Sequence, residues 1–290
     1  MNDVKQSLYK FMKKIITLSL LFISSITFAQ NKEKVKGSKI VKLEQKQVEN
    51  FESIEVEDNL DVFLVKGKEC GLEIEADDNL IEFIEYKLTG KNLRISTSKD
   101  LSSYKKLSVR ITYTDTFNMV IVKDETNVTA LSDIVLNTIT FKCYDYSKLF
   151  LNAKTKDFTL MANDKSKVEL NLNSDKTAID LSKNAYVKGL ISSIDMRFDM
   201  YQKSSAEIEG EVVNLKVRQD NNSEFMGKKL ITKNAILETN NDSKNTINVN
   251  NILTLNASGT SEIKLFGEPT KIEIIRFIEN ASLFKKQLVK

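Results

Sequence analysis

Apolar and polar residues alternate along most of the chain after about residue 50, and this period of two predicts β-strands. Polar and acidic stretches separate the runs, as expected for turns. Between Leu80 and Leu88 the apolar spacing fits either a short helix or a strand, and the sequence leaves that segment open. The first alternating runs are 51–56, 61–65, 72–76, 92–96 and 107–113.

Further along, one short pattern returns: a turn residue, a small residue and then alternating apolar positions. Asp164 and Ser166 lead in this way into Val168. The six steps from Ser147 to Ser261 average 19 residues, and such a period in strand-like sequence is typical of a solenoid. We take the recurring small residues to be Asn127, Ser147, Ser166, Ala185, Ala206, Ser223, Ser243, Ser261 and Ser282.

Each repeat is interpreted as one coil of a β-helix. A single coil cannot bury its own apolar side, so neighbouring coils must stack. Glycines recur four residues after three successive small residues, at Gly189, Gly210 and Gly227, and predict a place where the backbone bulges. The positions two residues after the small residues are mostly apolar. They are Thr129, Leu149, Val168, Val187, Ile208, Phe225, Asn245, Ile263 and Phe284.

Turns and chain ends agree with this interpretation. The single proline, Pro269, follows the last strong repeat, so it removes no hydrogen-bond donor from the coils before it. The basic tail 285–290 is expected to blunt the open edge of a final, irregular coil. Asp and Asn residues that can form tight turns precede the small residues at Asp145, Asp164, Asn184, Asn221 and Asp242.

The first 29 residues have the order of a secretory signal peptide. Lys13 and Lys14 precede an apolar run, and a small residue, Ala29, comes before Gln30. Met12 is an alternative start, and a membrane anchor is the alternative to a cleaved signal. No transmembrane segment is expected after signal removal. The prediction is a signal peptide over 1–29, a flexible leader over 30–48 that adds a strand near 40–43, and one solenoid domain over 49–290. Within that domain, 49–118 is less regular, and 119–290 holds the regular repeats and a C-terminal cap.

Removing the signal changes the charge balance. The whole chain has 43 Lys plus Arg and 40 Asp plus Glu, but residues 1–29 hold four Lys and one Asp, which leaves 39 of each. Nucleic-acid binders need basic surface to displace counterions from phosphates, so a nucleic-acid partner is not expected. Cys70 and Cys143 lie 73 positions apart; two separate thiols are favoured, and a disulfide is the alternative.

Composition excludes several chemistries. The chain has no His, so catalytic triads and His-ligated metal sites are excluded, and Cys143 lacks the usual basic partner of a nucleophile. No glycine fingerprint for nucleotides occurs. No metal and no cofactor is therefore expected. Trp is absent, and the tyrosines that could replace it weakly as platforms for sugars are Tyr104, Tyr113, Tyr144, Tyr146, Tyr186 and Tyr201.

Carboxylates are the remaining candidates for chemistry. β-Helices that cleave polysaccharides need clustered acids for Ca²⁺ binding or for acid and base catalysis. Asp195 and Asp199 are four residues apart on one predicted strand, so both should point to the same face. Since charged side chains at alternate strand positions occur in any solenoid, we expect solvated residues here and no catalytic residue. The other acid pairs are Asp77 with Asp78 and Glu273 with Glu279.

The motifs at both ends of the repeats resemble a known family. Phe51, Ser53, Ile54 and Val56, followed by 61–67 and 76–80, are similar to the opening of the "putative auto-transporter adhesin, head GIN domain" family, a domain of unknown function common in Bacteroidetes. Residues 257–267 resemble its closing motif. The resemblance implies a right-handed β-helix and an exported or surface-exposed protein, and it carries over no catalytic residues.

These observations lead to one main hypothesis and two alternatives. The main hypothesis is an all-β, exported, non-enzymatic solenoid of the periplasm, outer membrane surface or exterior that binds a protein or glycan along its faces. The first alternative is a carbohydrate-active lyase or hydrolase that uses Asp195 and Asp199. The second is a structural spacer without a binding patch. The sequence leaves the ligand and the oligomeric state open.

Overall fold

The computed structural model describes residues 32–287, in which nearly all regular structure is β-strand. The chain divides into two compact units, Met1–Glu33 and Lys34–Lys290, and all strands belong to the second. The expected signal peptide over 1–29 and the alternative start at Met12 lie outside the described residues. Within 32–287, no helix is long and apolar enough to cross a membrane.

The second unit contains the β-solenoid that the repeats predict. From residue 148 to residue 257 each coil is a single strand of 14 to 16 residues that bends near its middle. At the first bend Lys156 falls between the paired residues Thr155 and Asp157 and has no partner of its own in the ladder. These strands are β14 (Lys148–Ala162), β15 (Lys167–Leu181), β16 (Tyr186–Met200), β17 (Ser205–Gln219), β18 (Glu224–Thr239) and β19 (Lys244–Ala257).

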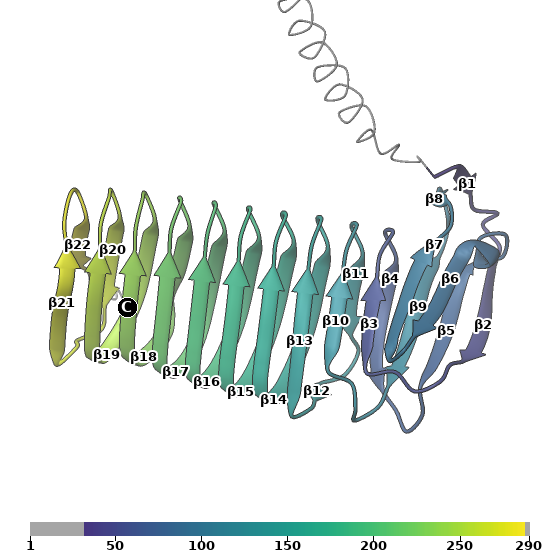
Figure 1. Cartoon of the computed structure of the whole chain (residues 1–290), viewed down its shortest axis with the longest axis horizontal. Coiled ribbons are helices and arrows are strands. Elements are labelled where there is room, and N and C mark those ends of the chain that lie inside the picture. The colour runs from purple at the N-terminus through teal and green to yellow at the C-terminus, as the bar shows by residue number, and fades with distance from the viewer. Residues whose placement is uncertain (1–31, 288–290) are drawn as a thin grey trace, which may run out of the picture. The chain divides into compact units, whose positions relative to one another are not determined.

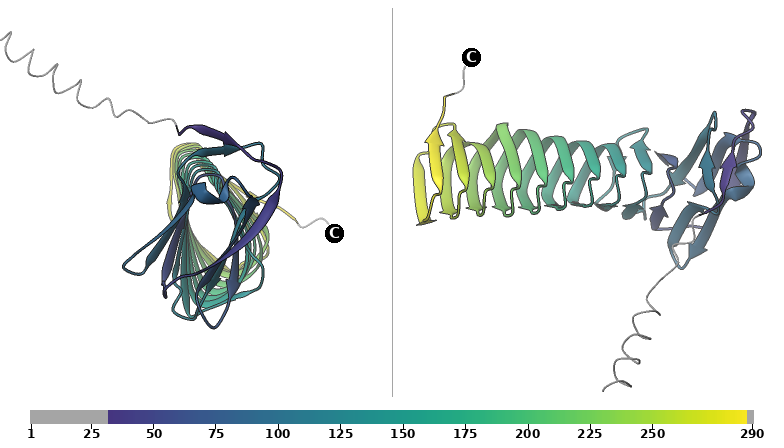
Figure 2. Two further views of the ribbon diagram at one scale, coloured as in Figure 1. Left: turned by 90° about the vertical axis from the view of Figure 1, so that its right-hand side faces the viewer. Right: turned by 90° about the horizontal axis from the view of Figure 1, so that it is seen from above.

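Successive coils pair in parallel and in register, as Figure 1 shows. Leu149 pairs with Val168 and Val168 with Val187, which confirms the 19-residue period. The strand halves before the bend form one face of the solenoid, called here the first face, and the halves after the bend form the second face. Figure 2 shows the two faces enclosing the interior along the axis. Inward side chains of both faces form one continuous apolar core.

The column of small residues differs from the prediction in three coils. Because Tyr186 pairs with Ser205, the neighbour of Ala185 is Ser204, whereas Ala206 takes the apolar position assigned to Ile208. Consecutive small residues at 204–206 made these alternatives indistinguishable from sequence. By the same reasoning, the column contains Thr126 instead of the predicted Asn127, and Ala281 instead of the predicted Ser282. The buried members of the column are Thr126, Ser147, Ser166, Ala185, Ser204, Ser223, Ser243 and Ser261.

Between residues 119 and 244 each coil returns to the first face through a tight turn with two left-handed residues. In one of them Asp164 and Lys165 have φ values of 51° and 66°, and the Ser166 amide donates to the Asn163 carbonyl at 3.1 Å. Positive φ at both central positions, together with this bond, defines a type I′ turn. The predicted turn residues Asp145, Asp164, Asn184, Asn221 and Asp242 all have positive φ, which confirms their role.

The three glycines do not form one column, but two of them mark irregularities. Gly189 pairs with Ile208, whereas Gly210 pairs with Ile191. At Gly210, φ is 115° and a Cβ atom would lie 2.2 Å from the Ile191 carbonyl oxygen, so only glycine fits. The strand pairing shifts register between Glu207 and Gly210 and again after Gly227. These shifts confirm the predicted bulge at Gly210 and Gly227.

The beginning of the unit mixes parallel coils with antiparallel pairs. On the first face, β5 pairs antiparallel with β2 on one side and with β9 on the other. On the second face, β6 pairs antiparallel with β7. The segment left open by the sequence is a 3₁₀ turn, η1 (Ile81–Phe83), followed by a strand. The strands are β1 (Lys34–Lys36), β2 (Val41–Gln47), β3 (Ser53–Val56), β4 (Asp61–Lys66), β5 (Gly71–Asp77), β6 (Ile84–Thr89), β7 (Asn92–Thr97), β8 (Asp100–Ser102), β9 (Leu107–Tyr113), β10 (Met119–Val122), β11 (Asn127–Ala130), β12 (Ile134–Val135) and β13 (Thr138–Cys143).

Three strands form the last coils: β20 (Glu262–Phe266), β21 (Lys271–Phe277) and β22 (Ser282–Lys285). In the basic tail, Lys285 donates from Nζ to Glu268 at 2.8 Å, and Lys286 lies 5.5 Å from the centre of the Phe284 ring. The remainder of that tail, 288–290, lies outside the described residues, so its effect on the edge stays a prediction.

Candidate functional site

Asp195 and Asp199 both lie on the outer side of β16, in the second face, as their spacing predicts. Their surroundings differ. Asp195 is exposed, whereas Asp199 is only 3% exposed. Arg197 occupies the outward position between them and pairs with Asp199. The two carboxylates therefore belong to separate hydrogen-bonded systems.

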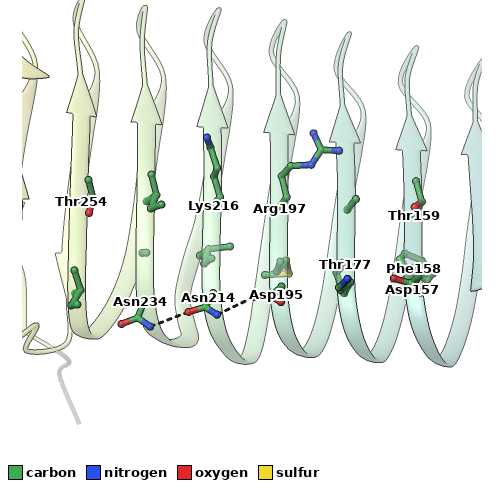
Figure 3. A pocket seen from close by; sticks show the side chains of 17 residues that line it. Asp157, Phe158, Thr159, Thr177, Asp195, Arg197, Asn214, Lys216, Asn234 and Thr254 are labelled. Carbon is green, nitrogen blue, oxygen red and sulfur yellow. Dashed lines mark hydrogen bonds between the residues drawn. The ribbon is translucent and has the colours of Figure 1, made fainter. Parts of the chain in front are cut away.

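Asp195 ends a ladder of side-chain amides that crosses four coils, part of which is shown in Figure 3. Asn214 donates from Nδ2 to Oδ1 of Asp195 at 2.9 Å, and Asn234 donates to Asn214 at 2.9 Å. Asn251 continues the ladder by donating to Asn234 at 2.8 Å. The carboxylate suits this end because it only accepts hydrogen bonds when ionised.

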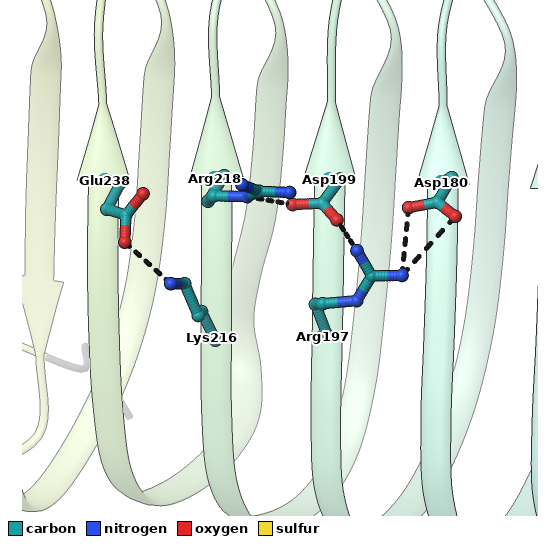
Figure 4. A network of polar contacts seen from close by, with 6 residues as sticks. All are labelled: Asp180, Arg197, Asp199, Lys216, Arg218 and Glu238. Carbon is teal, nitrogen blue, oxygen red and sulfur yellow. Dashed lines mark hydrogen bonds and ion pairs between the residues drawn. The ribbon is translucent and has the colours of Figure 1, made fainter.

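Asp199 is enclosed by two guanidinium groups, as Figure 4 shows. Arg197 and Arg218 each donate to a different oxygen of this carboxylate. Arg197 also reaches the carboxylate of Asp180 in the preceding coil at 3.3 Å. Both oxygens of Asp199 are thus engaged, and the network links three coils through charge-assisted bonds.

A depression of about 700 Å³ runs across the second face beside Asp195. Its lining combines the amides of Asn214 and Asn234 with the aliphatic side chains of Ile236 and Ile252, which are 45% and 37% exposed. A surface with apolar area and a few polar groups suits binding of a ligand. Its length along several coils fits an extended ligand better than a compact one.

The acid pair Asp77 and Asp78, at the end of β5, fastens the beginning of the unit. Asp77 is buried and accepts amide hydrogens from Lys39, Lys105 and Lys106 at 2.8 to 3.0 Å. Burial alone would raise the pKa of Asp77, but these hydrogen bonds outweigh it, and the pKa lies below the ordinary 3.8. Asp78 accepts a hydrogen bond from the Ser38 hydroxyl. Both acids therefore hold the chain around residues 36–40.

The other acid pair does not converge. Glu273 pairs with Lys271, whose hydrogen bond is the main reason that the pKa of Glu273 lies below its ordinary value. Glu279 accepts the amide hydrogen of Gly259 at 2.6 Å. Over the residues that the structure describes, no group of three or more Asp, Glu, Cys or His side chains is arranged to hold a metal ion.

The two cysteines are free and buried, which confirms the expectation of separate thiols. Burial raises the pKa of Cys143 to about 12, so its thiol is protonated at neutral pH. Among the tyrosines, Tyr113 is buried and stacks on Phe117 with ring centroids 4.7 Å apart. Tyr146 is 53% exposed on the turn edge, where Lys165 donates to its hydroxyl at 2.6 Å.

Sequence reasoning missed Arg197, Arg218 and the asparagine ladder. The ladder could have been found, because Asp195, Asn214 and Asn234 follow one another at steps of 19 and 20 residues. The ion pairs left a weaker signal: Arg197 and Asp199 share one strand and Arg218 follows Asp199 by 19 residues, but side-chain direction decides which charged groups meet.

Comparison with known protein families identifies the family of this chain. The model of the family "Putative auto-transporter adhesin, head GIN domain" matches residues 50–269. The chain belongs to this family. The GIN-family assignment covers most of the solenoid and confirms the resemblance found at the opening and closing motifs. A comparison with curated proteins gave no match.

Solved structures support the fold of this GIN-family chain. A putative adhesin from Parabacteroides merdae is similar over 88% of this chain and 99% of its own, with a TM-score of 0.65 and 13% identity. A putative adhesin from Parabacteroides distasonis covers 88% and 100%, with a TM-score of 0.64 and 15% identity. A putative lipid binding protein from the same species covers the same shares, with a TM-score of 0.60 and 14% identity. At such identities the likeness concerns the fold alone.

Proposed function

We propose that this protein is an exported, adhesin-like solenoid of the cell envelope that binds a protein or glycan partner along its second face and catalyses no reaction. The depression beside Asp195 carries the proposal, because exposed Ile236 and Ile252 adjoin the amides of Asn214 and Asn234. Family membership supports the adhesin-like role. The engagement of Asp199 by two arginines supports a structural role for that acid.

A glycan array and a panel of polysaccharides, probed with purified protein, test binding and turnover together. We expect binding without new reducing or unsaturated ends, with and without Ca²⁺. Ile236→Arg, inside the depression, should weaken binding at least about tenfold. Ile231→Arg is the matched control, since Ile231 is similarly exposed at 47% but lies outside that depression. Product formation that Asp195→Ala abolishes would instead establish the carbohydrate-active alternative.

A negative glycan result directs the test to proteins. Envelope proteins retained by the wild-type chain and by Ile231→Arg, but not by Ile236→Arg, would identify a protein partner on the second face. Equal retention by the wild type and both variants would contradict binding in the depression and favour the spacer.

Export has its own test. Mass spectrometry of the protein from fractionated cells should find a mature chain that begins at Gln30, in the periplasmic, outer-membrane or external fraction. An uncleaved chain confined to the cytoplasm would contradict this part of the proposal.

A further inference from the structure

The last coil leaves strand edges without a partner. Within the described residues, β21 pairs only with β19, and β22 pairs only with β20. Both strands stand at the end of the row of coils in Figure 1. Their outer edges expose backbone N–H and C=O groups, which can pair with a strand from another chain.

The same coil also leaves the core uncovered. Ile272 pairs with Leu253 and Ile274 with Leu255, so both continue inward columns of the solenoid. Leu253 and Leu255 are fully buried, whereas Ile272 and Ile274 are 44% and 57% exposed. Ile275 is 72% exposed and Phe284 is 45% exposed. The end of the solenoid is therefore an apolar surface bordered by open strand edges.

The opposite end of the unit is built differently. There the outermost strands are β2 on the first face and β6 on the second, and both pair antiparallel with the strand behind them. Their exposed positions carry the charged residues Lys42, Glu85 and Lys87 beside the apolar Leu43 and Tyr86. Charged side chains on edge strands oppose pairing with another chain. A second copy is therefore expected to meet the C-terminal coil with its own C-terminal coil.

The sequence of β21 is complementary to itself when two copies run antiparallel. If Ile272 lies opposite Phe277 of the second copy, Glu273 lies opposite Arg276 and Ile274 opposite Ile275. The register shift after Leu255 places Ile274 and Phe277 level with the buried residues Leu255 and Ala257. Apolar side chains thus oppose apolar ones, and acids oppose bases.

We infer that two copies of this protein associate through their C-terminal coils, with β21 pairing antiparallel to β21 about a two-fold axis. The axis is perpendicular to the second face at the open edge of β21. Such an interface is isologous, with the same residues contributed by both copies. Arg276 is available for it, because it makes no ion pair within residues 32–287, whereas Glu273 would exchange Lys271 for Arg276 of the second copy.

Sedimentation equilibrium of the full chain, from about 1 to 100 µM, tests this interface. We expect a reversible dimer. Glu273→Arg alone and Arg276→Glu alone should each weaken dimerisation by about tenfold or more, because like charges then face each other. The double variant Glu273→Arg with Arg276→Glu should restore it, since opposite charges again oppose. These side chains lie on the outer side of the strand, so the variants are expected to fold, and far-ultraviolet circular dichroism checks this.

An apolar variant with a matched control completes the test. Ile274→Lys should leave only monomer, whereas Ile231→Lys, at a residue 47% exposed and away from the last coil, should dimerise as the wild type does. A wild-type chain that stays monomeric at all these concentrations would overturn the inference. So would a dimer that Ile274→Lys leaves intact, or single charge variants that the double variant fails to rescue.

Discussion

Asn214 donates a hydrogen bond from its side-chain amide to the carboxylate of Asp195, one coil earlier, at 2.9 Å. The bond repeats from coil to coil because parallel in-register strands place equivalent side chains beside one another. Asp195, an exposed acid that its sequence makes a candidate catalytic residue, is therefore the end of a ladder of hydrogen-bonded side chains.

Removing an inner member of the ladder should cost more than removing one partner of a separate amide pair. Asn234→Ala deletes the bond to Asn214 and the bond from Asn251, and we expect a loss of about 1 kcal/mol in the free energy of unfolding. Asn171→Ala, which deletes a single bond to Asn152, is the control and should cost about half as much. Urea unfolding measures both. An equal loss in the two variants would contradict an additive ladder.

The ion network around Asp199 should be sensitive to loss of the acid. Asp199→Ala leaves Arg197 and Arg218 without their carboxylate, and we expect a loss of about 2 kcal/mol. This is less than for a fully buried pair, because the arginine side chains are 43% and 42% exposed. Glu209→Ala removes the exposed pair with Lys229 and should leave the urea midpoint unchanged. Similar midpoints for both variants would refute the difference.

The turns contain strain that glycine can relieve. Lys203 has a φ of 62°, and an L-residue in this left-handed region costs about 1–2 kcal/mol relative to glycine. Lys203→Gly should therefore stabilise the protein by about 1 kcal/mol, after the added freedom of the unfolded chain is subtracted. Lys188→Gly, within strand β16, is the opposite control and should destabilise it by about 0.5–1 kcal/mol. Thermal unfolding of both variants decides the sign.

The small-residue column contains buried hydroxyl groups that make no hydrogen bond within the described residues. Ser204 is buried, and its hydroxyl has no hydrogen-bond partner in the described part of the chain. Ala185 occupies the equivalent position one coil earlier, so Ser204→Ala should fit and stabilise the protein by about 1 kcal/mol. Ser193→Ala is the contrasting buried serine, because Ser193 receives a bond from Thr177 at 3.0 Å. It should be destabilising, and a gain in both variants would refute the distinction.

Asp77 should contribute a stability that depends on pH. Its pKa in the folded protein lies below the ordinary 3.8, so its contribution is complete above that value and is lost as the pH falls through the folded pKa. Asp77→Asn should therefore be less stable than the wild type at pH 7, and the difference should shrink as the pH falls below about 4. Urea unfolding from pH 7 to pH 2 measures the difference. A difference that is constant over this range would contradict the role of the charge.

The sequence by itself determined the repeating part of the fold. Alternation identified strands, the 19-residue period identified coils, and Asp and Asn residues identified the turns, because each signal depends on residues that are close in the chain. Family membership was also readable from short motifs at 51–67 and 257–267. These features are local, or they recur at a constant spacing.

Which residues lie side by side became clear from the folded coils alone. Ser204, rather than Ala206, belongs to the small-residue column because of the pairing between coils. The bulges near Gly210 and Gly227 shift the pairing, and the alternation of apolar and polar residues does not reveal the size of the shift. The contacts of Asp195 and Asp199 likewise depend on side chains brought together from neighbouring coils. Such contacts are set by the exact register and by side-chain direction, and the repeat period gives the register only up to the bulges that change it.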